Sequence, residues 1–248
     1  MRSCPLFLLS FVLACCLCVP GAAQQVNIEI NTLSLFDSAR NRPVPLCIYA
    51  PVKEGKGRLK PALISHGYGG KNNGYGFIAA YLAAHGYYVV SIQQDLPEDA
   101  PMPNTGKPYE VRMPFWKRGA ESILFTLNEL KKTKPSLDYQ HLLLVGHSNG
   151  GDMSMLFAKN YPGLAAAIIS LDNRRMPFPR AERPRVLSLR SSDQPADSGV
   201  IPTPAEQARY HMKVVKLPAT IHNDMWDGAT EAQKAEMLRY IGAFLRTL

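Results

Sequence analysis

Cysteine is scarce in the part of this chain that is expected to fold. The 248 residues contain 5 cysteines, of which four stand in the first segment: Cys4, Cys15, Cys16 and Cys18. If that segment is removed, Cys47 alone remains, and a single cysteine excludes an internal disulfide. Cys47 lies in an alternating, strand-like stretch, which indicates a small buried hydrophobic residue.

Long apolar runs are missing beyond the first residues. Residues 6–19 form an apolar stretch that is shorter than a membrane-spanning helix. Arg2 precedes this stretch and small residues follow it at 21–23, an order typical of a signal peptide. We therefore expect residues 1–23 to be a signal peptide that is removed on export.

The expected mature domain, residues 24–248, would then reside in the periplasm or outside the cell. A second cleavage signal lies inside the leader, because residues 12–15 resemble a lipoprotein cleavage box. Cleavage there would leave Cys15 as a lipid-anchored first residue. A lipid anchor is thus the alternative to a free exported protein, and stable membrane insertion is not expected.

No run of like charge gathers the basic residues. The formal net charge is +8 and the sequence pI is about 9.3, but Lys and Arg are scattered among Asp and Glu along the chain. This distribution argues against a nucleic-acid partner. A hydrophobic content of 46% over this length is enough for the core of a single domain.

Two phosphate-binding signatures are also absent. No Gly-Lys-Ser or Gly-Lys-Thr of a P-loop occurs, and the glycines at 67 and 69 are followed by Asn72 where a dinucleotide fingerprint has glycine. These departures argue against a nucleotide site.

Two kinds of periodicity organise the chain. Residues 26–36 and 44–49 alternate apolar with polar side chains, which predicts an antiparallel pair at one edge of a sheet. Beyond them, short apolar runs alternate with stretches of helical period. This alternation predicts an α/β fold, with a mostly parallel sheet and helices on both faces.

The connections between these elements differ in length. Residues 93–114 contain five prolines and are expected to form a long functional surface loop, followed by a helix at 115–131. Residues 172–184 are too few and too rich in proline and arginine to hold a helical lid. We expect both loops to line the entrance to a site.

Ser148 stands at the junction of a buried strand and a helix. The apolar run 142–145 precedes it, and helical spacing follows it. Gly146 and Gly150 flank it with the spacing of a nucleophile elbow, in which a tight turn leaves no room for side chains beside the serine. This context predicts that the Ser148 hydroxyl is held out above the sheet.

A serine hydroxyl needs a base and an acid before it is a useful nucleophile. His222 lies in a polar loop between the last expected strand and the closing helix. Asp193 follows the strand at 185–189 and is the first candidate for the acid. Asp197 is the second, and either could instead cap a turn or a helix. The order serine, aspartate, histidine is that of an α/β-hydrolase.

Acyl transfer also needs amide donors for the oxyanion. The expected donors are the backbone N–H groups of Asn149, directly after the nucleophile, and of Tyr68, in a glycine-rich turn after an early strand. His66 and His147 flank these two turns and are expected to support them.

The motifs at residues 63–70, 146–151 and 222–224 together resemble those of the α/β-hydrolase superfamily. Within it, the chain is similar to compact, lidless esterases related to dienelactone hydrolases, platelet-activating-factor acetylhydrolases and polyester hydrolases. The resemblance implies a mostly parallel eight-stranded sheet with helices on both faces and no lid domain. One departure is Arg190, where a glycine is common in the acid loop.

The resemblance further implies a serine hydrolase that cleaves carboxylic esters through an acyl-enzyme intermediate. Its substrate would be a small-molecule or polymeric ester, and neither a metal nor an organic cofactor is expected. A peptidase or amidase with the same three residues is one alternative. A non-catalytic binding protein on a hydrolase scaffold is the other.

Overall fold

The computed structural model describes residues 26–52 and 57–248. The expected signal peptide at 1–23 and the alternative start at Cys15 lie outside the described residues. Within the described ranges, no helix combines the length and the apolar character needed to cross a bilayer.

The described residues contain a single eight-stranded sheet with the spatial order β1-β2-β4-β3-β5-β6-β7-β8. From β3 onward neighbouring strands run parallel, whereas β2 pairs antiparallel with both β1 and β4. The strands are β1 (Ile28–Asp37), β2 (Arg42–Pro51), β3 (Lys60–Ser65), β4 (Tyr87–Ile92), β5 (Leu143–His147), β6 (Ala167–Leu171), β7 (Arg185–Arg190) and β8 (Lys213–Lys216). The expected α/β-hydrolase sheet and its antiparallel edge pair are confirmed.

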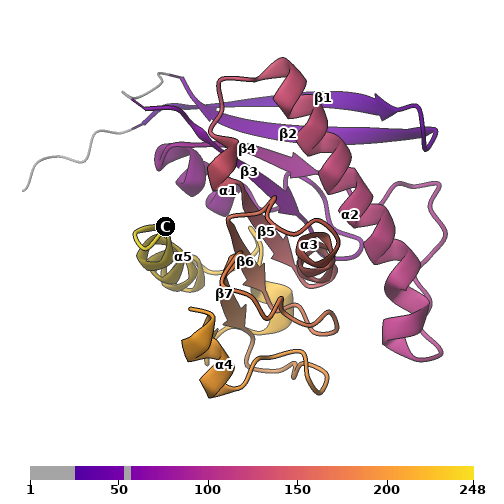
Figure 1. Cartoon of the computed structure of the whole chain (residues 1–248), viewed down its shortest axis with the longest axis vertical. Helices are drawn as coiled ribbons and strands as arrows, with labels where there is room; N and C mark the ends of the chain where they lie inside the picture. The colour runs from indigo at the N-terminus through magenta and orange to yellow at the C-terminus, as the bar shows by residue number, and fades with distance from the viewer. Residues whose placement is uncertain (1–25, 53–56) are drawn as a thin grey trace, which may run out of the picture.

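Helices cover both faces of this sheet (Figure 1). The α-helices are α1 (Gly76–Ala84), α2 (Pro108–Thr133), α3 (Asn149–Asn160), α4 (Pro204–Arg209) and α5 (Glu231–Leu245). Two short 3₁₀ helices, Tyr139–His141 and His222–Asp224, complete the described elements. Helices α1 and α5 pack on one face, and α2 and α3 pack on the other (Figure 1).

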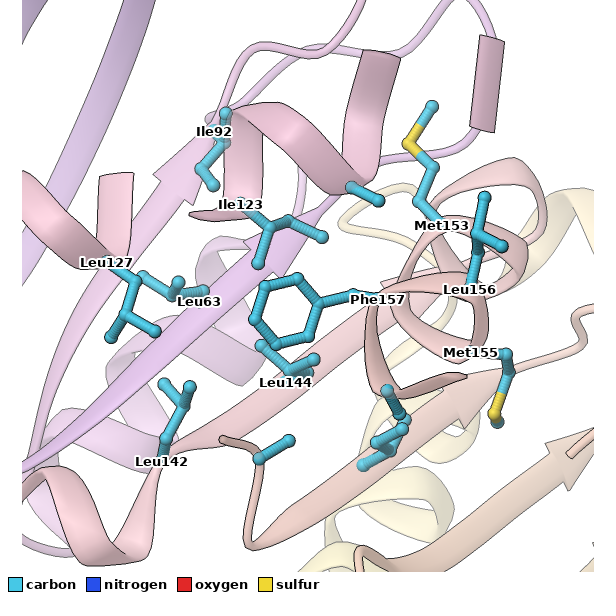
Figure 2. Packing of buried hydrophobic residues seen from close by; sticks show 14 of the residues in the cluster. Leu63, Ile92, Ile123, Leu127, Leu142, Leu144, Met153, Met155, Leu156 and Phe157 are labelled. Carbon is cyan, nitrogen blue, oxygen red and sulfur yellow. The ribbon is translucent and has the colours of Figure 1, made fainter. Parts of the chain in front are cut away.

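The core between the sheet and α2 and α3 fixes where the nucleophile turn lies. In Figure 2 the ring of Phe157, on α3, lies between Ile123 of α2 and Leu144 of β5. All three side chains are buried. Because β5 leads into α3 across one residue, this packing holds both arms of the turn at Ser148.

One connection differs from its prediction. The proline-rich loop expected at 93–114 ends earlier, because α2 begins at Pro108 and contains Pro114. Proline fits the first turn of a helix, where its missing N–H has no intrahelical acceptor. The loop therefore comprises residues 93–107.

Two other expectations match the structure. Residues 172–184, between β6 and β7, contain no helix, so no lid is inserted there. Cys47 is buried in β2 and carries a free thiol.

Candidate active site

Ser148 occupies a strained turn between β5 and α3. Its backbone has a φ of +50° and a ψ of −113°, a left-handed conformation that side-chain-bearing residues rarely adopt. Its N–H donates to the carbonyl of Leu171 at 2.8 Å, and its own carbonyl accepts from the Asp152 N–H at 3.0 Å. These bonds tie the turn to β6 and to the first turn of α3.

Only glycine fits at positions 146 and 150, because a side chain there would overlap neighbouring backbone atoms. A Cβ on Gly146 would lie 2.3 Å from the carbonyl oxygen of Gly150, and a Cβ on Gly150 would lie 2.1 Å from the carbonyl oxygen of Ser65. Both distances are far inside van der Waals contact. The close backbone approach predicted from the Gly-x-Ser-x-Gly spacing is therefore present.

His222 lies within hydrogen-bond distance of Ser148. Its Nε2 is 2.9 Å from the Ser148 Oγ, and its Nδ1 is 2.6 Å from Oδ2 of Asp172. The carboxylate accepts from Nδ1–H, which leaves Nε2 free to accept the serine proton. The structure thus joins a serine, a histidine and an aspartate in one hydrogen-bonded chain.

Asp172 is fully buried and held as a carboxylate. Its oxygens accept from the Ser191 hydroxyl at 2.7 Å and the Ser191 N–H at 3.1 Å, and the Arg190 guanidinium lies 2.9 Å away. Burial alone would raise its pKa, but the hydrogen bond from His222, the charge of Arg190 and the Ser191 donors together lower the pKa below its ordinary value.

The expected pairing of Asp193 with the imidazole differs from the structure. Asp193 is exposed, and its carboxylate accepts from the backbone N–H of His222 at 2.7 Å. It therefore holds the backbone at the start of the 3₁₀ helix His222–Asp224. Asp197, the second candidate, is exposed, and its N–H donates to the carbonyl of Arg174. Neither aspartate contacts the imidazole ring.

Strand order explains why Asp172 takes that position. The β6 strand pairs directly with β5, with Leu171 opposite His147, and the carboxyl ends of parallel strands meet at one edge of the sheet. Asp172 follows Leu171 and so lies beside the nucleophile turn. Asp193 follows β7, one strand farther away. The sequence signal was an aspartate directly after the buried strand expected at 164–171.

The two expected oxyanion donors lie on the turns that carry them. Asn149 is the first residue of α3, where a backbone N–H has no intrahelical acceptor. In the other turn, Gly67 donates to the Tyr75 hydroxyl, Gly69 to Asp95 and Gly70 to the Gly67 carbonyl. Among the described residues no group accepts from the Tyr68 N–H, so this amide is available to a ligand.

His147 connects the two turns to the His222 loop. Its Nε2 lies 3.1 Å from the carbonyl oxygen of His222, which can only accept, so Nε2 carries the proton. Its Nδ1 then accepts from the Tyr75 hydroxyl at 2.7 Å, and that hydroxyl accepts from the Gly67 N–H at 3.2 Å. His147 supports the site in this way as a neutral imidazole.

His66 supports the glycine-rich turn. Its Nδ1 donates to the Gly67 carbonyl at 2.7 Å, and its Nε2 accepts from the Gln94 N–H at 2.8 Å. One contact was not foreseen from the sequence: the indole N–H of Trp116, on α2, donates to the side-chain oxygen of Asn149 at 2.6 Å. This bond ties α2 to the residue after the nucleophile.

In the described ranges, no group of three or more His, Cys, Asp or Glu side chains is placed to hold a metal ion.

The sheet order, the turn at Ser148 and the family comparison define an ester hydrolase of the α/β-hydrolase class. Residues 18–173, more than half of the chain, match the model of the chlorophyllase family. The chain therefore belongs to the chlorophyllase family. A search of curated proteins finds no match.

Solved structures share the fold at low identity. A ferulic acid esterase from Streptomyces cinnamoneus is 19% identical over 84% of this chain and 78% of its own, with a TM-score of 0.59. A dienelactone hydrolase-like promiscuous phosphotriesterase from metagenomic libraries is 14% identical over 88% and 98%, with a TM-score of 0.66. A fungal esterase from Rhizomucor miehei is 15% identical over 89% and 83%, with a TM-score of 0.61.

The buried imidazole of His147 generates a prediction about acid stability. Burial, reinforced by the neighbouring His222, lowers the pKa of His147 from 6.5 to about 3. As the pH falls below about 6.5, His147 binds a proton in the unfolded chain but stays neutral in the folded protein. The contribution of neutral His147 to the free energy of unfolding is therefore fully present above pH 6.5 and is lost as the pH falls toward 3. The free energy of unfolding should fall more steeply in wild type than in His147→Asn, by up to about 1.4 kcal/mol per pH unit.

Urea unfolding at a series of pH values measures both slopes. His85→Asn, which removes an exposed imidazole, is the matched control and should keep the wild-type slope. Equal slopes in wild type and His147→Asn would show that His147 is not held neutral.

Proposed function

We propose that this protein hydrolyses carboxylic esters by acyl transfer through Ser148. The observation that carries the proposal is the hydrogen-bonded chain from Ser148 Oγ to His222 Nε2, at 2.9 Å, and from His222 Nδ1 to Asp172, at 2.6 Å. Membership of the chlorophyllase family supports the ester class.

In the proposed mechanism, His222 Nε2 removes the proton of Ser148 as Oγ attacks the ester carbonyl carbon. Asp172 holds the ring in this orientation and stabilises the imidazolium that forms. The amides of Tyr68 and Asn149 donate to the oxyanion. His222 then protonates the leaving alkoxide, and a water molecule, deprotonated by the same nitrogen, hydrolyses the acyl-serine ester.

The space around the turn favours a substrate that extends beyond the scissile bond. A cavity of about 580 Å³ lies beside the glycine-rich turn that contains Tyr68. It is lined by Tyr68 and its neighbours and by Gln93 and other residues of the 93–107 loop. The 93–107 loop is held there because the Met102 N–H donates to the Tyr68 hydroxyl at 2.9 Å. Because residues 172–184 insert no helical lid, the proposal admits both small and polymeric esters at Ser148.

Two isosteric variants test the assignment of the acid. Asp172→Asn should lower kcat for a p-nitrophenyl ester by about 10⁴, because the amide can no longer hold the productive tautomer of His222. Asp193→Asn should lower it by no more than about tenfold, since it weakens one backbone hydrogen bond. Ser148→Ala, the control, should abolish labelling by a fluorophosphonate probe. A larger loss in Asp193→Asn than in Asp172→Asn would refute the assignment.

A peptidase or amidase could use the same groups. The leaving group separates the two classes, so kcat/KM is compared between a p-nitrophenyl ester and the p-nitroanilide with the same acyl group. We expect the ratio of kcat/KM to the uncatalysed rate constant to be clearly higher for the ester than for the anilide. A higher ratio for the anilide would show that the protein is an amidase and not an esterase.

We propose further that the protein is exported, on the pattern of residues 1–23 described above. The intact mass of the protein recovered from its native host decides between the alternatives. A chain beginning at residue 24 supports a free exported protein, and a lipid-modified chain beginning at Cys15 supports the anchored form. A full-length cytoplasmic chain would contradict both.

A further inference from the structure

Three arginines gather beside the nucleophile turn. Arg174 and Arg175 lie two and three residues after Asp172, and Arg112 lies near the start of α2. All three are partly buried. None of them has a role in the proposed acyl transfer.

Hydrogen bonds tie the segments that carry these arginines to the first turn of α3, which follows Ser148. The Arg175 N–H donates to Asp152 Oδ1 at 3.0 Å, and the Asp152 N–H donates to the Ser148 carbonyl at 3.0 Å. On the other side, Trp116 lies one helical turn after Arg112 and donates to Asn149, the residue after the nucleophile. Both hydrogen bonds therefore end on residues of α3 that lie within one helical turn of Ser148.

The three guanidinium groups lack carboxylate partners. Among the described residues, no carboxylate oxygen lies within 4.0 Å of any of them. Their Nε atoms are buried without a hydrogen-bond partner. By contrast, partly buried Arg42 is paired with Asp99 at 2.6 Å, and buried Arg190 with Asp172 at 2.9 Å. Arg112, Arg174 and Arg175 therefore lack the carboxylate pairing that Arg42 and Arg190 have.

The nearest acids do not neutralise the cluster. Asp172 is already bound by His222 and Arg190. Asp152 is buried and accepts three hydrogen bonds, and its burial raises its pKa, which favours the uncharged form. Asp197 is exposed to solvent. Burial and mutual repulsion lower the pKa values of Arg112 and Arg174, and the charges of Asp152 and Asp197 offset only part of this lowering.

We propose that Arg112, Arg174 and Arg175 form a subsite for a carboxylate group of the ester substrate. The planar fork of a guanidinium matches a carboxylate in two parallel hydrogen bonds, and each of these three guanidinium groups lacks a carboxylate partner within the described part of the protein. This inference rests on the proposed ester hydrolysis and names its substrate class: esters that carry an anionic group near the scissile bond.

Two matched substrate pairs test the subsite. The mono-p-nitrophenyl ester of succinic acid is compared with p-nitrophenyl butyrate, which places the carboxylate on the acyl side. Para-acetoxybenzoate is compared with its methyl ester, which places it on the alcohol side. In wild type, kcat/KM should favour the anionic ester of at least one pair by about tenfold or more, the size of one charge-assisted hydrogen bond.

Single Gln substitutions at residues 112, 174 and 175 should each lower this ratio of anionic to neutral substrate, and the triple variant should abolish it. Lys117→Gln is the matched control, because it removes an exposed positive charge from the same helix. It should keep the wild-type ratio. Added salt should lower the wild-type ratio, which tests the interaction without any substitution.

The subsite is refuted if neither pair shows an anionic preference, or if the triple variant keeps it. Failure of the ester hydrolysis itself is distinguishable, since then neither the anionic nor the neutral esters would be cleaved in a Ser148-dependent way.

Discussion

The left-handed backbone of Ser148 is the constraint on which the site depends. A φ of +50° at a residue with a side chain is unfavourable, and the surrounding structure maintains it. Glycine at 146 and 150 permits the close backbone contacts, and Leu171 fixes the Ser148 N–H. Packing of β5 and α3 around Phe157 then keeps the two arms of the turn in place. The hydroxyl is consequently presented to His222 without a conformational change.

The part of the site that is local in sequence could be predicted. A strand, a Gly-x-Ser-x-Gly turn and a helix occupy one continuous stretch, and His222 was indicated by its place before the closing helix. The acid could not be placed in this way, because Asp172 and Asp193 both follow buried strands. Only the pairing of β6 with β5 puts Asp172 behind the imidazole. The start of α2 is not predictable from Pro108 for a different reason, because proline suits both a loop and the first turn of a helix.

Charge shows the same contrast between sequence and structure. Along the chain the basic residues are dispersed, and the net charge of +8 indicates no partner. Folding brings Arg112 from α2 to Arg174 and Arg175 in the loop after β6, a neighbourhood that no linear pattern reveals. Meanwhile Arg190, the last residue of β7, pairs with buried Asp172 and supports its ionised form. Arg190 therefore binds a carboxylate of the protein itself, and in our proposal the cluster of three arginines binds a carboxylate of the substrate.

The most direct test is a crystal structure of the protein after reaction with a fluorophosphonate, whose tetrahedral phosphorus resembles the intermediate of ester cleavage. The expected adduct is bonded to Ser148 Oγ, with one phosphonyl oxygen about 2.7–3.1 Å from the amide nitrogens of both Tyr68 and Asn149 and with His222 still bound to Asp172. An adduct on another residue, or an oxygen directed away from both amides, would contradict the proposed site.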